Sequence, residues 1–174
     1  MSDEILVQKV IDGDSAALDE LLERYYPKIL KYCLFHLSSK EEAEDATQDV
    51  MIKAVRHIRS SSFSFRFCPY IYQIARNTCI DIYRKPKPDT VSLDSGDFLI
   101  PSPSYTTSSG INDEELIALI QSLPDDLSEV ILLRYSQQLS LKEIAVITNV
   151  PLRTAQSRLN RAIKKLRKEY KHNA

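Results

Sequence analysis

Apolar side chains recur at helical spacing over two stretches of this chain, which a polar, proline-rich stretch separates. The first stretch covers residues 3–85, and one of its apolar faces follows the i, i+3, i+4, i+7 rule of an amphipathic helix. That face consists of Leu18, Leu21, Leu22 and Tyr25. The helical spacing returns at Asn112. The pattern predicts an all-α protein with two small helical domains, residues 1–86 and 112–174, joined by an irregular linker, residues 87–111.

Capping residues divide the first domain into helices. Asp14 or Ser15 can cap a helix after Gly13, and Pro27 predicts a kink within it. Ser39 and Glu42 form a capping-box pattern that opens the next helix. The buried face of that helix would be Ala43, Ala46, Val50, Ala54 and Val55. A further helix is predicted from Tyr70 to about Arg84, buried through Ile71, Ile74, Ala75 and Ile82.

The stretch from Pro86 to Ile111 has four prolines, two of the three glycines, and no lysine or arginine after Lys87. Such a composition is too polar and too often interrupted by proline to pack a core. Three glycines in the whole chain are also few for a hairpin-rich β fold or a glycine-rich phosphate loop. The composition therefore favours helices throughout the two domains.

The stretch from about Leu127 to Tyr170 has the pattern of a helix-turn-helix. Leu123–Pro124 ends the preceding helix, and Asp125 or Asp126 can cap the helix that follows. Ser140 and Glu143 form a second capping box, which starts a short helix. Its buried residues would be Leu141, Ile144, Ala145 and Ile147. Asn149 tolerates the left-handed backbone of a tight turn, and Pro151 suits the start of the next helix.

The helix after Pro151 has two different faces. At 100° per residue, its apolar side would be Ala155, Leu159, Ala162 and Leu166. The opposite side would be Arg153, Ser157, Asn160 and Lys164, flanked by Gln156 and Arg161. Arginine can bind guanine, asparagine or glutamine can bind adenine, and lysine neutralises phosphate. A short helix, a tight turn and a second helix of this kind predict a domain that binds duplex DNA.

The net charge of −1 conceals a basic end and an acidic beginning. Acidic residues outnumber basic ones before Arg56, whereas Glu169 is the only acidic residue after Leu152. The basic residues there are Arg153, Arg158, Arg161, Lys164, Lys165, Arg167, Lys168 and Lys171. Two different partners are indicated, and the partner of the basic end would be a polyanion.

With these residues in view, the chain resembles a bacterial sigma factor of the extracytoplasmic-function class. The segment LSLKEIAVITNVPLRTAQSRLNRAIKKLR, residues 139–167, is similar to the domain of that family that recognises the −35 promoter element. AEDATQDVMIKA, residues 43–54, is similar to its polymerase-binding helix. YIYQIARNTCIDIYRK, residues 70–85, is similar to its promoter-melting and −10-recognition helix. Both halves occur in the order of the family, on either side of a linker.

The resemblance implies a role for individual residues. The positions that dock on the β′ clamp of core RNA polymerase would be Asp45, Gln48 and Asp49, which share one helix edge. The −10 and melting residues would be Phe63, Phe65, Tyr70, Arg76, Asn77, Arg84 and Lys85. Asn77 would hold a flipped base beside a loop over residues 60–67. The aromatic side chains of that loop, Phe67 included, could stack on bases, but alternating aromatic residues more often belong to a core. Four residues match DNA-facing positions of the −35 domain: Arg134, Thr154, Ser157 and Arg161. The predicted −35 set also includes residues of the exposed face described above: Arg153, Gln156, Asn160 and Lys164.

The resemblance also implies the partners. These are core RNA polymerase, through its β′ clamp and β flap, promoter DNA, and an anti-sigma factor that can be membrane-anchored. The acidic linker would thread the polymerase channel. Four positions depart from the family: Tyr70 stands for a usual tryptophan, Met51 for phenylalanine, Arg153 for glycine and Gln156 for a basic residue. The last two indicate that the −35 sequence differs from that of relatives.

Two other classes of protein fit the sequence less well. A transcriptional regulator with a ligand-sensing first domain would need neither the Asp45 edge nor the Asn77 helix. An enzyme or metal sensor would need more than Cys33 and His36, whose spacing suits a ligand pair but whose cysteine lies on an apolar face. We therefore expect no catalysis, no cofactor and no bound metal. An acidic N-terminus without a signal-peptide pattern and three cysteines without a CxxC pair predict a cytoplasmic protein.

Overall fold

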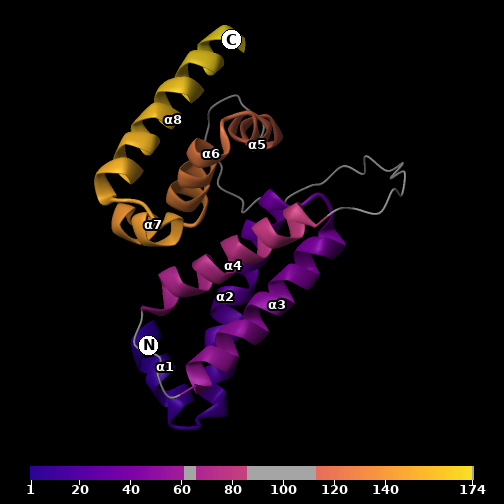
Figure 1. Ribbon diagram of the computed structural model, residues 1–174, viewed down its shortest axis with the longest axis vertical. Coiled ribbons are helices and arrows are strands. Elements are labelled where there is room, and N and C mark those ends of the chain that lie inside the picture. Colours follow the sequence, from indigo (N-terminus) through magenta and orange to yellow (C-terminus); the bar gives the residue numbers. More distant parts are fainter. Residues whose placement is uncertain (61–65, 86–112, 174) are drawn as a thin grey trace. The chain divides into compact units, whose positions relative to one another are not determined.

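The computed structural model describes residues 1–60, 66–85 and 113–173, with the side chains of residues 113, 114, 172 and 173 left aside (Figure 1). The chain divides into two compact units, Met1–Ile100 and Pro101–Ala174. Every regular element in the described ranges is a helix, as the apolar spacing predicts. Among the same residues, no helix is both long and apolar enough to cross a lipid bilayer.

The described residues of the first unit form four helices, α1 (Asp3–Ile11), α2 (Ser15–His36), α3 (Lys40–Arg59) and α4 (Phe67–Arg84). α2 packs against α1, α3 and α4, and α3 also packs against α4 (Figure 1). The largest fully buried side chains are those of Leu6, Leu21, Ile29, Tyr32, Ile58, Phe67, Ile71 and Tyr72. α2 continues through Pro27 as one helix.

A polar cluster fastens α1 to α2. The Asp3 carboxylate accepts hydrogen bonds from the buried Tyr25 hydroxyl and from Arg24, whose Nη1 lies 2.6 Å from Asp3 Oδ1. Arg24 also pairs with Glu20 at 2.8 Å. Burial and the bond to Asp3 raise the pKa of Tyr25, so its hydroxyl remains a donor. Asp14 caps α2 by accepting from the backbone N–H groups of residues 16 and 17, as one of the two predicted caps.

The sequence reading of α3 and α4 needs two corrections. α4 begins at Phe67, three residues before the predicted Tyr70, because Pro69 fits within a first helical turn whose N–H groups have no helical partner. The predicted buried positions Val55, Ile74 and Ile82 are only half-buried. Ser39 caps α3 as predicted, since its hydroxyl accepts from the Glu42 N–H at 3.1 Å.

The second unit contains α5 (Asp113–Gln121), α6 (Asp125–Ile131), a π-helical turn η1 (Leu132–Ser136), α7 (Leu141–Thr148) and α8 (Leu152–Asn173). α8 packs against both α6 and α7, and α5 packs against α6. The fully buried residues of the second unit include Leu127, Val130, Leu133, Ile144, Ala155 and Ala162. Three of the four predicted buried positions of α7 are buried, and Leu141 is half-buried.

The start of α6 differs from the prediction. Pro124 occupies the N-cap position, and neither Asp125 nor Asp126 caps the helix with its side chain. Both aspartates lie instead in the first turn, where the helix dipole favours negative charge. Asp126 also pairs with Arg158 of α8, with 3.3 Å between Oδ2 and Nε.

Candidate nucleic-acid interface

The turn between α7 and α8 has the local structure that its residues predict. Ser140 and Glu143 form a complete capping box, with the Ser140 N–H donating to Glu143 at 2.8 Å and the Glu143 N–H donating to Ser140 at 3.3 Å. Asn149 ends α7 in the left-handed region, at φ 53° and ψ 49°. Pro151 precedes α8, and its carbonyl accepts the first helical hydrogen bonds, so it lies one residue before the helix. These bonds fix the direction in which α8 leaves the turn.

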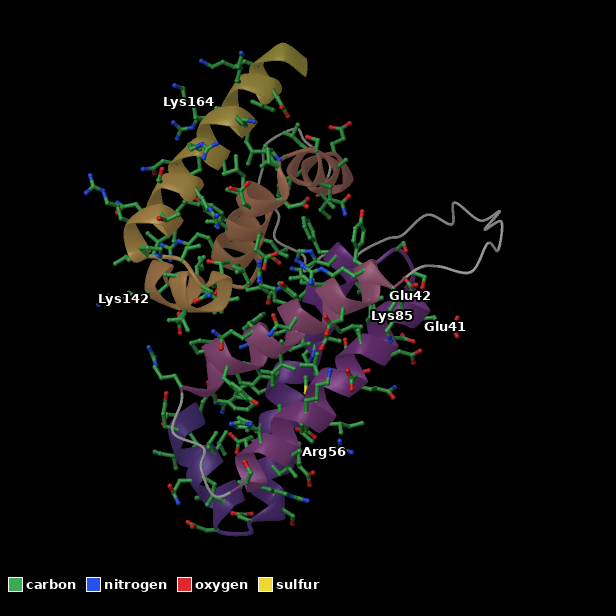
Figure 2. The ribbon with its side chains drawn as sticks, viewed as in Figure 1. Glu41, Glu42, Arg56, Lys85, Lys142 and Lys164 are labelled. Carbon is green, nitrogen blue, oxygen red and sulfur yellow. The ribbon has the colours of Figure 1, made fainter. Side chains whose placement is uncertain are left out.

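α8 separates its two faces as predicted. Ala155 and Ala162 are completely buried and Leu159 is 8% exposed, whereas Leu166 is half-buried. The opposite side chains are exposed, and Figure 2 shows Lys164 extending from this helix. The exposed set consists of Arg153, Gln156, Ser157, Asn160, Arg161 and Lys164, with Thr154 half-buried beside it. This face can therefore approach DNA without disturbing the core.

Arg134 lies in η1, at the connection to α7. Its Nη1 donates to the backbone carbonyl of Leu139 at 2.9 Å, which joins the two ends of the connecting segment. The residue is exposed, and a guanidinium has five N–H donors, so further donors remain for another acceptor. Arg134 thus has a structural contact that its sequence position did not reveal.

Asp45, Gln48 and Asp49 line one edge of α3, opposite its buried face. Asp45 and Gln48 are exposed, and Asp49 is half-exposed. The Asp49 carboxylate lies 2.6 Å from the Lys53 ammonium, one helical turn farther on. Glu41 and Glu42, labelled in Figure 2, extend the acidic character of α3 to its N-terminus.

A pocket with a volume of about 460 Å³ lies between α3 and α4. It is lined by Lys53, Arg56, His57, Ser60, Tyr70, Ile74, Asn77, Thr78 and Asp81. The Lys53 ammonium donates to the Thr78 hydroxyl at 3.3 Å, which connects α3 to α4 across the pocket wall. The rings of His57 and Tyr70 lie 4.9 Å apart, and Arg56 projects from α3 (Figure 2).

The pocket combines groups that suit an unpaired nucleotide. Asn77 is exposed and offers both a donor and an acceptor, Lys53 and Arg56 supply positive charge, and Tyr70 supplies an aromatic face. Partial burial raises the pKa of Tyr70, so its hydroxyl stays protonated. The sequence reading identified Tyr70 and Asn77 but missed Lys53, Arg56 and His57. Their i, i+3, i+4 spacing places them on one face of α3 and could have indicated them.

The other described residues of the first unit that were predicted to bind the −10 element do not line this pocket. Arg76 is half-buried, and Arg84 and Lys85 are exposed where α4 ends. Phe63 and Phe65 lie outside the described residues. Two roles were open for Phe67, stacking on bases and packing in the core, and the structure confirms the core role. Its ring is 2% exposed and packs edge-on against Tyr25 with 5.0 Å between centroids, so no base can reach it.

The cysteines do not form a metal site in the described part of the chain. Cys33 is completely buried, as its place on an apolar face predicts, and its sulfur lies 3.8 Å from that of Cys79. The Cys79 thiol lowers the pKa of Cys33, against an opposing effect of burial. No group of three or more histidine, cysteine, aspartate or glutamate side chains among the described residues is arranged to hold a metal ion.

Comparison with known proteins gives matches for both units. Residues 21–87 match the family model "Sigma-70 region 2", and residues 113–166 match "Sigma-70, region 4". The chain is 32% identical to the ECF RNA polymerase sigma factor SigW of Bacillus subtilis (strain 168), over 94% of each chain. It is 30% identical to the ECF RNA polymerase sigma-E factor of Escherichia coli (strain K12), over 93% of this chain and 91% of the relative.

The fold is also similar to a solved structure. CnrH in complex with the cytosolic domain of CnrY matches with a TM-score of 0.74 and 18% identity, over 99% of each chain. This likeness concerns the arrangement of the helices.

A core role for Phe67 predicts a large loss of stability on truncation. Phe67→Ala should reduce the free energy of unfolding by about 3–5 kcal/mol, because it removes a buried ring and leaves a cavity beside Tyr25. Urea unfolding followed by circular dichroism measures this change. Tyr83→Ala, at a side chain that is 83% exposed, serves as the control and should change stability by less than about 0.5 kcal/mol. Equal stabilities for Phe67→Ala and the parent chain would contradict the core role.

Proposed function

The chain belongs to the sigma-70 family as an RNA polymerase sigma factor of the extracytoplasmic-function class, and we propose that its two units bind separate promoter elements. Such a factor directs promoter recognition by RNA polymerase and catalyses no reaction. In our proposal the domain over residues 112–174 binds duplex −35 DNA, and the domain over residues 1–86 binds core polymerase and the melted −10 element. The observation that carries the proposal is the exposed polar face of α8 opposite its buried alanines.

We propose that α8 enters the major groove of the −35 element. Arg153, Gln156, Asn160 and Arg161 can donate to or accept from base edges, and the exposed Lys164 can neutralise phosphate. Thr154, Ser157 and Arg134 complete the contact set, with Arg134 placed beside the helix-turn-helix by its bond to Leu139. The capping box and the Asn149 turn support this role, because they hold α8 at a fixed angle to α7.

The pocket between α3 and α4 is the proposed site for an unpaired −10 base. Asn77 would form hydrogen bonds with the base edge, and Tyr70 would stack on the base. Lys53 and Arg56 would neutralise the phosphates that accompany the flipped nucleotide. Arg76, Arg84 and Lys85 would extend the basic surface along α4, and Phe63 and Phe65 belong to the same proposal on sequence alone. Binding unpaired bases more tightly than paired ones favours the open state of the promoter.

The acidic edge of α3 is the proposed contact with core polymerase. Asp45, Gln48 and Asp49 would dock on the β′ clamp, and the second unit would contact the β flap. The edge is exposed and opposite the packed face of α3, so docking requires no rearrangement of the core.

We also propose control by an anti-sigma factor. CnrH, to which the fold is similar, is described in complex with the cytosolic domain of CnrY, and the sigma factor RpoE of Bartonella quintana is described in complex with the anti-sigma factor NepR. RpoE matches this chain with a TM-score of 0.66 and 20% identity. Because polymerase and promoters lie in the bacterial cytoplasm, the proposed function places the chain there.

Run-off transcription is the direct test of the function. The full chain should direct core RNA polymerase to discrete start sites within a library of fragments from the genome that encodes it. Core polymerase alone is the control and should give no such transcripts. If no template in the library yields a transcript that depends on the chain, the assignment fails.

Removing one proposed base contact tests the role of α8. Arg161→Ala should weaken binding of the holoenzyme to a promoter fragment by about 1–3 kcal/mol and relax its preference at one −35 position. Arg167→Ala removes another exposed arginine of the same helix as a matched control and should leave that preference unchanged. Electrophoretic mobility shifts on fragments with single −35 substitutions measure both effects. A loss that is the same for every sequence would identify Arg161 as a phosphate contact.

Asn77→Ala tests the pocket separately from the −35 contact. The variant should bind duplex −35 DNA as the parent chain does but form fewer open complexes, because the flipped base loses its hydrogen-bonding partner. Permanganate reactivity of promoter thymines measures strand opening. Gln8→Ala, an exposed amide of α1 outside the pocket, is the control. Permanganate reactivity equal to that of the parent chain would exclude a role for Asn77 in strand opening.

A further inference from the structure

α8 is longer than a DNA-recognition contact requires. It runs from Leu152 to Asn173, 22 residues, which corresponds to a length of about 33 Å. The residues proposed to contact bases, Arg153 to Arg161, span about 12 Å of that length, which is close to the width of the major groove. More than half of the helix therefore extends beyond the proposed base contacts.

The basic residues of this extension continue the recognition face. At 100° per residue, Lys164, Lys168 and Lys171 fall within the same sector of about 80° as Arg153 and Arg161. All five side chains are exposed, and the sector lies opposite the buried face of α8. The helix thus has one continuous cationic stripe, Arg153, Arg161, Lys164, Lys168 and Lys171, rather than two separate basic patches.

The stripe is not neutralised within the described part of its own unit. Glu169, the only acidic residue of α8, lies outside the stripe, with its carboxylate 3.5 Å from the Ser122 hydroxyl. The ion pair between α8 and α6 involves Arg158, which also lies outside the stripe. Among described residues, no acidic group pairs with Lys168 or Lys171. Their charges are available to an external anion.

The position of these lysines along the helix identifies the anion. Lys168 and Lys171 lie about 10 Å and 15 Å beyond Arg161 along the axis of α8, so a helix whose first half occupies the groove carries them past its edge. The phosphate backbone borders the groove there. We propose that Lys168 and Lys171 bind backbone phosphates of the duplex that flanks the −35 element, independently of its sequence. This inference rests on the proposed −35 role of α8.

The salt dependence of DNA binding tests the proposal. Lys168→Gln/Lys171→Gln removes two charges and keeps residues that favour a helix. The variant should bind a promoter fragment, as holoenzyme, about tenfold more weakly at low salt, and its slope of log K against log salt should be smaller by about 2. The loss should be equal on a fragment in which the sequence that flanks the −35 element is scrambled. It should disappear when the duplex is cut at the edge of the −35 element on the side that the lysines contact.

A second variant of the same helix provides the matched control. Lys165→Gln/Arg167→Gln also removes two exposed charges, but these residues flank the stripe on either side. Its salt slope should change less than that of Lys168→Gln/Lys171→Gln. Equal changes in the two variants would show a diffuse field of the helix instead of a phosphate contact by one face, and would overturn the proposal.

The remaining outcomes distinguish a failure of the −35 role from a failure of the phosphate contact. If scrambling the −35 element has no effect on the parent chain, the proposed −35 role itself fails. If that preference persists but the salt slope of Lys168→Gln/Lys171→Gln equals that of the parent, only the phosphate contact fails. If the variant instead loses affinity for core polymerase in the absence of DNA, the lysines bind an acidic protein surface and the proposal is wrong.

Discussion

The proposed interfaces depend on one constraint, the burial of small side chains on the opposite face of the same helix. Ala155 and Ala162 are completely buried in α8, and Ala43 and Ala54 are at most 1% exposed in α3. Alanine orders without loss of side-chain entropy and lets neighbouring helices approach closely. Because one face is fixed by packing, the rotation of each helix is fixed as well, and the polar face is presented in a defined direction.

The buried face of α3 fixes the direction of two exposed surfaces of this helix. One exposed edge displays Asp45 and Asp49, and the face toward α4 contributes Lys53 and Arg56 to the pocket beside Asn77. The ion pair between Asp49 and Lys53 lies between these two surfaces, with both side chains about half-exposed. Such a pair contributes only about 0–1 kcal/mol to stability. The same Lys53 ammonium also donates to the Thr78 hydroxyl of α4, so it contacts both helices.

Local signals made much of this architecture predictable from the sequence. The Ser140 capping box, the left-handed Asn149 and the two faces of α8 depend on residues close in sequence, and all three were predicted correctly. Contacts between residues that are far apart in the sequence were not predicted. The burial of Phe67 against Tyr25 and the pocket wall formed by Lys53 depend on how α2, α3 and α4 pack, which spacing within one helix does not specify. Pro124 replaced the expected aspartate cap because a helix can also begin directly after a proline.

The separation of faces in α8 has a consequence for divergence among related factors. Substitutions at exposed helical positions away from caps and buried contacts usually change stability by no more than about 0.5 kcal/mol. Arg153 and Gln156, both proposed to contact the −35 element, are exposed. With the proposed −35 role of α8, promoter preference can change after gene duplication by single substitutions that each leave a folded protein, so new regulatory circuits can evolve without compensating changes in the core.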